Sequence, residues 1–234
     1  MLYNIKDRLL ASGIHFLISL LVSLILGAIA YFSWFPGDLI KAGALTGFSI
    51  LIAVDITLGP LLTFFVFDKT KEKLKFDLTC LALLQIVCLC IGIWLIYSQR
   101  PVAQVLAEDG IHILAKDDAE HFNSNIKIGV FERPKFLIQD LPETLDEISQ
   151  VKFTSEFVEE RPFIYRSDLY LDVTLESLTK RIKLIDEALR ENQKEEIQNL
   201  ESHDCSWVPL HSKHRQGYAC ITLPNGIKHI SKPQ

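Results

Sequence analysis

The sequence over residues 42–67 is AGALTGFSILIAVDITLGPLLTFFVF, in which Asp55 is the one formally charged side chain. Two similar runs, Leu9–Phe35 and Leu78–Gln99, contain no formally charged side chain. A helix needs about 20 apolar residues to cross a bilayer core about 30 Å thick. The three runs therefore predict a membrane protein with transmembrane α-helices at about residues 13–35, 44–67 and 78–97.

The two parts of the chain differ in charge. Residues 1–100 contain eight Lys/Arg and six Asp/Glu, a net charge of +2, whereas residues 101–234 contain 16 and 23, a net charge of −7. We therefore expect a three-helix transmembrane region over residues 13–100, followed by a small α/β (α+β) domain over residues 101–234. Because the acidic domain repels phosphates, nucleic acid is excluded as a partner, and the lipid bilayer is the expected surroundings of the spans.

Basic residues predict the orientation of the spans. Lys6 and Arg8 precede the first span, and the loop after this span contains a single basic residue, Lys41. The loop between the second and third spans contains Lys69, Lys71, Lys73 and Lys75. Since basic loops stay in the cytoplasm, residues 1–12 are predicted to be cytoplasmic and the domain after Arg100 periplasmic, as in a multi-pass protein of a Gram-negative inner membrane. A cleaved signal sequence is less favoured because the first apolar run is long.

Asp55 lies near the middle of the second span and is followed by Gly59 and Pro60. An ionised carboxylate at that depth is costly unless it is paired or hydrated. A polar anchor for the membrane helix of another protein is favoured over ion transport, because a transporter usually needs more than one such group. A protonated carboxyl bonded to a neighbouring span is the structural alternative. Pro60 cannot donate to the Ile56 carbonyl, so we expect a kink there, with Gly59 allowing close helix approach.

Small residues form a ridge on the first predicted span. Ser19, Ser23 and Gly27 recur at every fourth position, which places them on one helix face. Such ridges allow tight helix packing in membranes. The ridge is predicted to pack either within this protein or against a partner helix, and this makes Ser19, Ser23 and Gly27 candidate partner-binding residues beside Asp55, Gly59 and Pro60.

The exported part shows strand and helix patterns. Strands are predicted at Val102–Leu106, Ile111–Leu114, Ile126–Phe131 and Phe136–Ile138. A 4-3-4-3-4 apolar stripe predicts a helix over about residues 174–200 that packs on a sheet: Leu171, Leu175, Leu178, Ile182, Ile185 and Leu189. A final hairpin is predicted from Tyr218–Leu223 and Ile227–Ile230, with a turn at Pro224-Asn225-Gly226.

Cys205 and Cys220 are the only cysteines of the exported part. In an oxidising compartment they are the candidate disulfide, with two free thiols as the alternative. Closing that loop would add about 3 kcal/mol of stability. The remaining cysteines, Cys80, Cys88 and Cys90, lie in the third span and are interpreted as packing residues.

Catalytic signals are absent from the sequence. It contains no Gly-rich phosphate loop, no G-x-S-x-G and no H-E-x-x-H, so we predict no enzymatic activity and no cofactor. A C-terminal group of possible ligands consists of His203, Cys205, His211, His214 and His229. We interpret the histidines as surface residues and predict no metal site, because His211-x-x-His214 is expected in a loop and Cys205 has a disulfide alternative.

Several motifs follow the three spans in a fixed order. They are Trp34-Phe35-Pro36, Val54-Asp55, Leu58-Gly59-Pro60-Leu61-Leu62-Thr63, Leu74-Lys75-Phe76-Asp77-Leu78, Leu84-Gln85 and Arg100-Pro101. This order resembles the TfpX/TfpZ family of type IV pilin accessory proteins of Gram-negative bacteria. The likeness covers residues 13–101. Beyond them it rests on Arg161-Pro162 with Tyr165 and on Trp207-x-Pro209-Leu210.

The resemblance implies an inner-membrane accessory factor for type IV pilus biogenesis, which binds or chaperones the pilin subunit and aids its assembly without catalysis. Its implied partners are the major pilin and other inner-membrane pilus assembly proteins. The spans would hold the hydrophobic pilin helix, and residues 102–234 would meet the pilin head. The alternative is a membrane-anchored periplasmic sensor or ligand-binding protein, which needs a partner to carry its signal because the predicted cytoplasmic segments are short. An ion-coupled transport component is a weaker alternative because no inverted repeat is visible.

Overall fold

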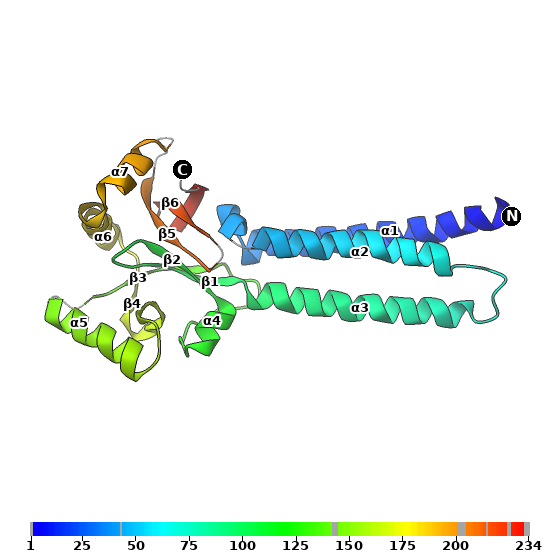
Figure 1. The fold of residues 1–234 in the computed structure, drawn as a ribbon, viewed down its shortest axis with the longest axis horizontal. Coiled ribbons are helices and arrows are strands. Elements are labelled where there is room, and N and C mark those ends of the chain that lie inside the picture. Colours follow the sequence, from blue (N-terminus) through cyan, green and yellow to red (C-terminus); the bar gives the residue numbers. More distant parts are fainter. Residues whose placement is uncertain are drawn as a thin grey trace. The chain divides into compact units, whose positions relative to one another are not determined.

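The computed structural model describes residues 2–42, 44–141, 145–200, 205–213, 215–223 and 226–231. The chain folds into two compact units, shown in Figure 1. The helical unit consists of Met1–Ala30 and Ala44–Tyr97, and the sheet unit consists of Tyr31–Gly43 and Ser98–Gln234. Residues 31–43, which connect the first two helices, thus belong with the sheet.

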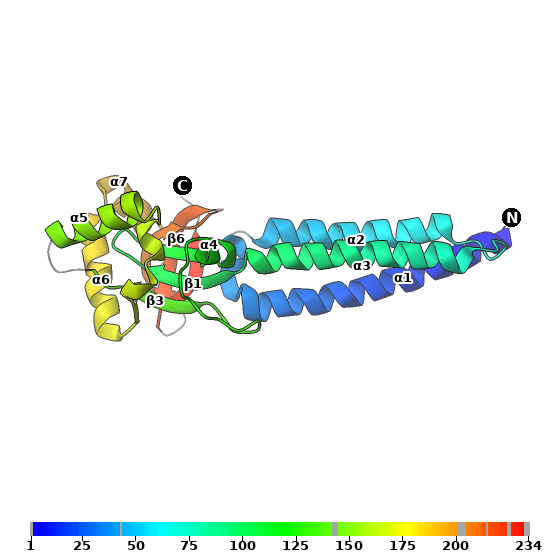
Figure 2. The same ribbon diagram turned by 90° about the horizontal axis from the view of Figure 1, so that it is seen from below.

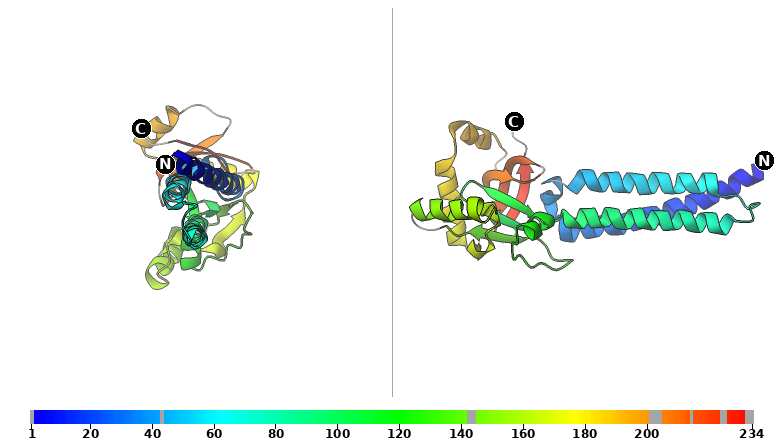
Figure 3. Two further views of the ribbon diagram at one scale, coloured as in Figure 1. Left: turned by 90° about the vertical axis from the view of Figure 1, so that its right-hand side faces the viewer. Right: turned by 60° about the horizontal axis from the view of Figure 1, so that its bottom comes forward.

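Three long helices build the helical unit, and Figures 2 and 3 show them running alongside one another: α1 (Leu2–Ile29), α2 (Ala44–Val66) and α3 (Leu74–Ser98). Ile5–Trp34, Gly47–Val66 and Leu74–Ser98 are long and apolar enough to cross a membrane. Three membrane helices followed by an α/β domain confirm the predicted fold class. The first helix begins before the predicted span because the charged residues from Lys6 to Arg8 continue it.

Helices α1 and α2 form the closest pair of the helical unit. On α1, Ser19 and Ser23 are buried. Gly27 lies against the Phe48 ring of α2, where an added Cβ would still have 3.5 Å of room. Helix α2 continues through Pro60 as one helix.

Seven strands of the described chain form one mixed sheet in the order β4-β3-β1-β2-β5-β6-β7. Strand β1 pairs in parallel with β3, and β2 pairs in parallel with β5, while the other neighbours are antiparallel. The strands are β1 (Pro101–Leu106), β2 (Ile111–Ala115), β3 (Lys135–Gln139), β4 (Tyr170–Asp172), β5 (Ser206–His211), β6 (Gln216–Thr222) and β7 (Gly226–Ser231).

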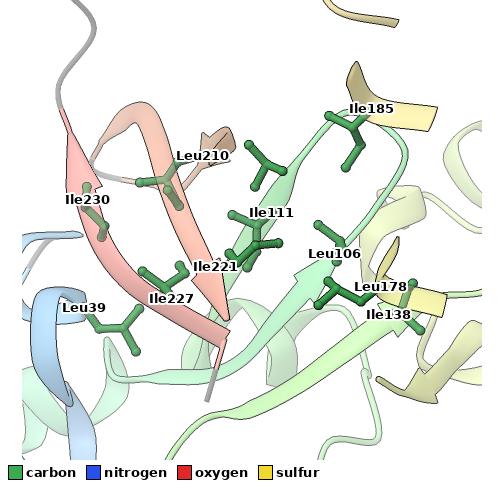
Figure 4. Packing of buried hydrophobic residues seen from close by; sticks show 12 residues of the cluster. Leu39, Leu106, Ile111, Ile138, Leu178, Ile185, Leu210, Ile221, Ile227 and Ile230 are labelled. Carbon is green, nitrogen blue, oxygen red and sulfur yellow. The ribbon is translucent and has the colours of Figure 1, made fainter. Parts of the chain in front are cut away.

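Helix α6 (Leu175–Ala188) covers one face of the sheet. It begins with a capping box, in which Thr174 Oγ1 accepts from the Ser177 N–H at 3.1 Å and Ser177 Oγ accepts from the Thr174 N–H at 2.9 Å. Leu178 and Ile185 of its apolar stripe are buried against the sheet, as Figure 4 shows. The prediction that this helix packs on a sheet is therefore confirmed.

The predicted helix over residues 174–200 is wrong in its length. Helix α6 ends at Ala188, Leu189 takes an extended conformation, and α7 (Glu191–Gln198) starts anew. Leu189 still packs against the core beside α6. Because no apolar residue continues the stripe at Asn192 or Glu196, the apolar packing on the sheet does not extend along a longer helix.

The predicted strand Ile126–Phe131 is also wrong. Ile126 and Ile128 do pack against the second core cluster, as their alternation indicates. The backbone carbonyls nearby, however, accept from side chains instead of from a strand: Arg100 donates to those of Val130 at 2.7 Å and Gly129 at 3.0 Å. Trp34 Nε1 donates to the Val130 carbonyl as well, at 2.8 Å. These side-chain donors satisfy the carbonyls, so the segment needs no backbone hydrogen bonds to a neighbouring strand.

The predicted C-terminal hairpin is confirmed, since β6 pairs antiparallel with β7. Its turn residues Pro224 and Asn225 lie outside the described residues. Strand β5 ends at His211, where the sequence indicates a loop. The sequence does not predict this strand because Pro209 lacks a backbone N–H donor and proline is rare inside strands. The predicted strands Val102–Leu106, Ile111–Leu114 and Phe136–Ile138 correspond to β1, β2 and β3.

The connection between α1 and α2 is folded against strand β7. It consists of a π-helical turn, η1 (Ala30–Trp34), and a 3-10 helix, η2 (Gly37–Ala42). Leu39 is 1% exposed, and Figure 4 shows it beside Ile227 and Ile230. Asp38 Oδ2 accepts from the Ile230 N–H at 3.0 Å, so the segment binds the backbone of an edge strand.

Shorter elements complete the sheet unit around strands β1 to β4. They are α4 (Lys116–His121), α5 (Leu145–Phe153), η3 (Thr154–Val158), η4 (Phe163–Tyr165) and η5 (Ser167–Leu169). Ala119 of α4 and Tyr165 of η4 pack in the second core cluster, against Val105 and Leu137 of the sheet. Both faces of β1 and β3 are therefore covered.

Candidate functional site

A groove of about 510 Å³ lies among the three helices of the helical unit. Its wall is largely apolar, with side chains such as Leu81 and Leu89 from α3. Five polar residues interrupt that wall: His15 and Ser19 of α1, Asp55 and Thr63 of α2, and Gln85 of α3. Polar groups from all three predicted spans thus meet in a groove whose wall is otherwise apolar.

A chain of hydrogen bonds crosses from α1 to α2 beside the groove. Thr63 Oγ1 donates to the Gly59 carbonyl at 3.0 Å, and His15 Nδ1 lies 2.6 Å from the same oxygen of Thr63. Because the Thr63 proton is used toward Gly59, the His15 Nδ1–H must donate to Thr63. Ser12 Oγ donates to the Pro60 carbonyl at 2.8 Å. These bonds fix the two helices together at the level of Gly59 and Pro60.

Gly59 allows the third helix to approach this point. An added Cβ would collide with the Gln85 side-chain amide and would lie 3.2 Å from His15 Nε2. Gln85 therefore occupies the space that the missing side chain leaves on α2. A second cavity, of about 100 Å³, is lined by Asp55, Gly59 and Gln85. Asp55 and Gln85 consequently border both spaces.

Asp55 is half-buried and lies on the groove wall. Its carboxyl group makes no hydrogen bond or ion pair with the residues that the structure describes. An acid in an apolar span is stabilised by a donor from a second helix or by water. The groove therefore presents a free acceptor to any helix that lies against it.

The structure brings together only some of the residues chosen from the sequence. Asp55 and Ser19 line the groove, Gly59 lines the smaller cavity, and Pro60 is held behind them by Ser12. Ser23 and Gly27 line neither cavity.

Sequence reasoning did not choose three polar residues of the groove: His15, Thr63 and Gln85. His15 and Thr63 continue patterns already present, because His15 precedes Ser19 by four residues and Thr63 follows Gly59 by four. The four-residue spacing that marked the small-residue ridge would have indicated these two.

The predicted disulfide is confirmed: Cys205 is bonded to Cys220, with their Cα atoms 5.6 Å apart. It ties the residue that precedes β5 to the buried centre of β6. Of the predicted histidine group, His203 and His214 lie outside the described residues, whereas His211 is on β5 and His229 is on β7.

Comparison with known proteins gives consistent matches. The family model of the fimbrial assembly protein FimB matches residues 3–37. The fimbrial assembly protein of serogroup E1 from Dichelobacter nodosus is 32% identical over 146 residues, which cover 61% of this chain and 50% of that protein. The serogroup I protein of the same organism gives the same values. The protein of serogroups C1 and C2 is 37% identical over 111 residues, 46% of this chain and 84% of that protein.

The chain spans about half the length of the first two of these curated relatives. No solved structure matches it significantly.

Proposed function

Because this chain belongs to the FimB family of fimbrial assembly proteins, we propose that it is an inner-membrane accessory factor of type IV pilus biogenesis that binds the pilin subunit. The observation that carries the proposal is the apolar groove, on whose wall Asp55 is an acceptor without a partner among the described residues. The relatives are named for assembly and not for a reaction, and the proposed role includes no catalytic step.

The groove suits a hydrophobic helix that approaches through the lipid. Its apolar wall can contact apolar side chains, and Asp55 can accept a hydrogen bond from a donor on the incoming helix. An unpaired polar group inside a bilayer is costly, so a partner that supplies the donor gains affinity and a fixed depth. Apolar contacts would thus supply the buried surface area, and the hydrogen bond to Asp55 would fix the position of the bound helix along the groove.

The proposed orientation places the N-terminus in the cytoplasm and the sheet unit in the periplasm. Arg8 pairs with Asp68 at 2.8 Å and Lys69 pairs with Asp7 at 2.8 Å, so the start of α1 and the lysine-rich loop after α2 lie at one end of the helical unit. Basic residues gathered at one end favour the cytoplasmic side. Reporter fusions after Asp68 and after Ser231 test this: only the second should be active with a periplasmic reporter, and the reverse pattern would contradict the orientation.

Pilin recovery from solubilised membranes tests the intramembrane contact. Asp55→Leu should reduce the pilin captured with the tagged chain several-fold, because the variant removes the acceptor while keeping the span apolar. Thr57→Leu is the matched control, since Thr57 is exposed in the same helix and lines neither cavity. Equal pilin recovery from the wild type and Asp55→Leu, at equal chain levels, would overturn the role of Asp55.

A second pair of variants tests the groove itself. Ala82 lines the groove, and Ala82→Phe should fill part of it and reduce pilin recovery. Leu83 is 58% exposed and is not on the wall, so Leu83→Phe should leave recovery unchanged. If both variants, or neither, lose pilin, the groove does not bind the pilin helix.

A further inference from the structure

Three potential metal ligands meet in the sheet unit. Asp109 lies in the turn between β1 and β2, His112 lies on β2, and His211 lies on β5. One ligand atom from each side chain lies within 4.8 Å of the others. His112 Nε2 is 2.8 Å from Asp109 Oδ1, and His211 Nε2 is 3.6 Å from Asp109 Oδ2. Both histidines therefore turn the same ring nitrogen toward Asp109: His112 Nε2 bonds its carboxylate, and His211 Nε2 lies 3.3 Å from its backbone carbonyl and near the second carboxylate oxygen.

The sheet topology creates this arrangement. Strands β2 and β5 are parallel, and their register places His112 directly beside His211. Each histidine follows a core residue along its strand, Ile111 or Leu210, so both point to the face opposite that core cluster. Their rings stack with centroids 4.6 Å apart at an interplanar angle of 22°. The register thus aligns the two rings.

Gly110 holds the acidic turn against β5. Its φ of +143° lies in a region that L side chains rarely adopt. An added Cβ would collide with the backbone carbonyl of Pro209. The turn can therefore pack directly on β5, and this close approach keeps Asp109 near His211.

The geometry points to a divalent transition-metal site, and we propose that Asp109, His112 and His211 bind Zn²⁺ or a similar ion. Zinc is bound by imidazole nitrogen and carboxylate oxygen at about 2.0–2.2 Å, which puts neighbouring ligand atoms of a tetrahedral site about 3.3 Å apart. The 2.8 Å and 3.6 Å separations of the two histidine nitrogens from the Asp109 oxygens lie on either side of that value.

The surroundings of the three ligands suit such an ion. The side chains are 55%, 20% and 37% exposed for Asp109, His112 and His211, so they can move and water can supply the fourth ligand. The ion would replace the proton that His112 Nε2 now shares with Asp109. Bound metal would cross-link the β1–β2 turn to β5 and thereby stabilise the centre of the sheet.

The test is Zn²⁺ binding to the full chain in detergent. The chain carries a histidine-free affinity tag and an intact disulfide, and its free cysteines Cys80, Cys88 and Cys90 are alkylated so that no thiol competes. Competition with a chromophoric chelator should give one bound Zn²⁺ per chain. Loss of an outer-shell partner alone weakens metal binding 10–100-fold, so loss of two direct ligands in His112→Gln/His211→Gln should weaken it by more than about 100-fold.

Two further variants make the result specific. His121→Gln is the matched control because His121 is exposed and outside the cluster, and it should bind like the wild type. Asp109→Asn keeps the shape of the turn and should also weaken binding.

The melting temperature supplies a second readout. At a 100-fold excess of Zn²⁺ over its Kd, it should rise by about 5–10 °C for the wild type but not for the double variant, whose metal-free melting curve reports folding independently. The proposal is overturned if wild type and folded double variant bind Zn²⁺ equally, or if His121→Gln loses binding to the same extent.

Discussion

The substitution Leu39→Ala tests whether the connection between the first two helices is part of the core of the sheet unit. Its side chain is 1% exposed and belongs to the main core cluster beside Ile227 and Ile230. Truncating a buried leucine to alanine costs about 3–5 kcal/mol where the site cannot collapse. Since η2 lies at the edge of the sheet and can relax partly, we expect Leu39→Ala to cost about 3 kcal/mol.

For a unit of this size, 1 kcal/mol shifts the melting temperature by about 2–4 °C, so Leu39→Ala should lower it by about 6–12 °C. Thermal unfolding of the detergent-solubilised chain, followed by tryptophan fluorescence, measures this because Trp34 and Trp207 lie in the sheet unit. Leu184→Ala is the control, as Leu184 of α6 is 46% exposed and should change stability by less than about 0.5 kcal/mol. Equal shifts for the two variants would refute the burial of the connection.

Two other predictions concern the sheet unit. Replacing Cys205 and Cys220 together by alanine should cost about 3 kcal/mol, because their 15-residue separation sets the entropy of the loop that the bond closes, and the same melting assay with and without reductant checks it. Burial acts to raise the pKa of Asp38, but hydrogen bonds from Lys41 and the Ile230 N–H outweigh it and lower that pKa. The Asp38 carboxylate should therefore stabilise the fold above its unfolded pKa of about 3.9 and lose this effect as the pH falls through the lower folded pKa. The difference in free energy of unfolding between the wild type and Asp38→Asn should accordingly become smaller below about pH 4. A difference that does not change with pH would contradict this prediction.

The sequence predicted the local structure best where composition is extreme or periodic. Each membrane helix follows from an apolar run longer than a bilayer core, and the sheet-packed helix α6 follows from a stripe whose Leu178 and Ile185 are buried. One failure occurred where distant side chains override a local pattern. The Ile126–Phe131 segment alternates like a strand, but Arg100 and Trp34 bind its carbonyls in place of a neighbouring strand.

The same distinction applies to the candidate site. Asp55 stands out in the sequence because a single acid in an apolar span is costly. His15, Thr63 and Gln85 become part of the site only because α1, α2 and α3 bring them to one level, where Gly59 leaves room for the Gln85 amide. A residue's neighbours along the chain do not specify which helix faces meet.

Hydropathy, charge and spacing thus determined the three spans, the acidic C-terminal part, the hairpin and the cysteine pair, because these depend on residues close together in the chain or on composition alone. The tertiary structure decided that residues 31–43 belong to the sheet unit and that His112 lies beside His211. Both facts depend on the register between segments about 100 or more residues apart, and packing sets that register through the combined burial of many side chains.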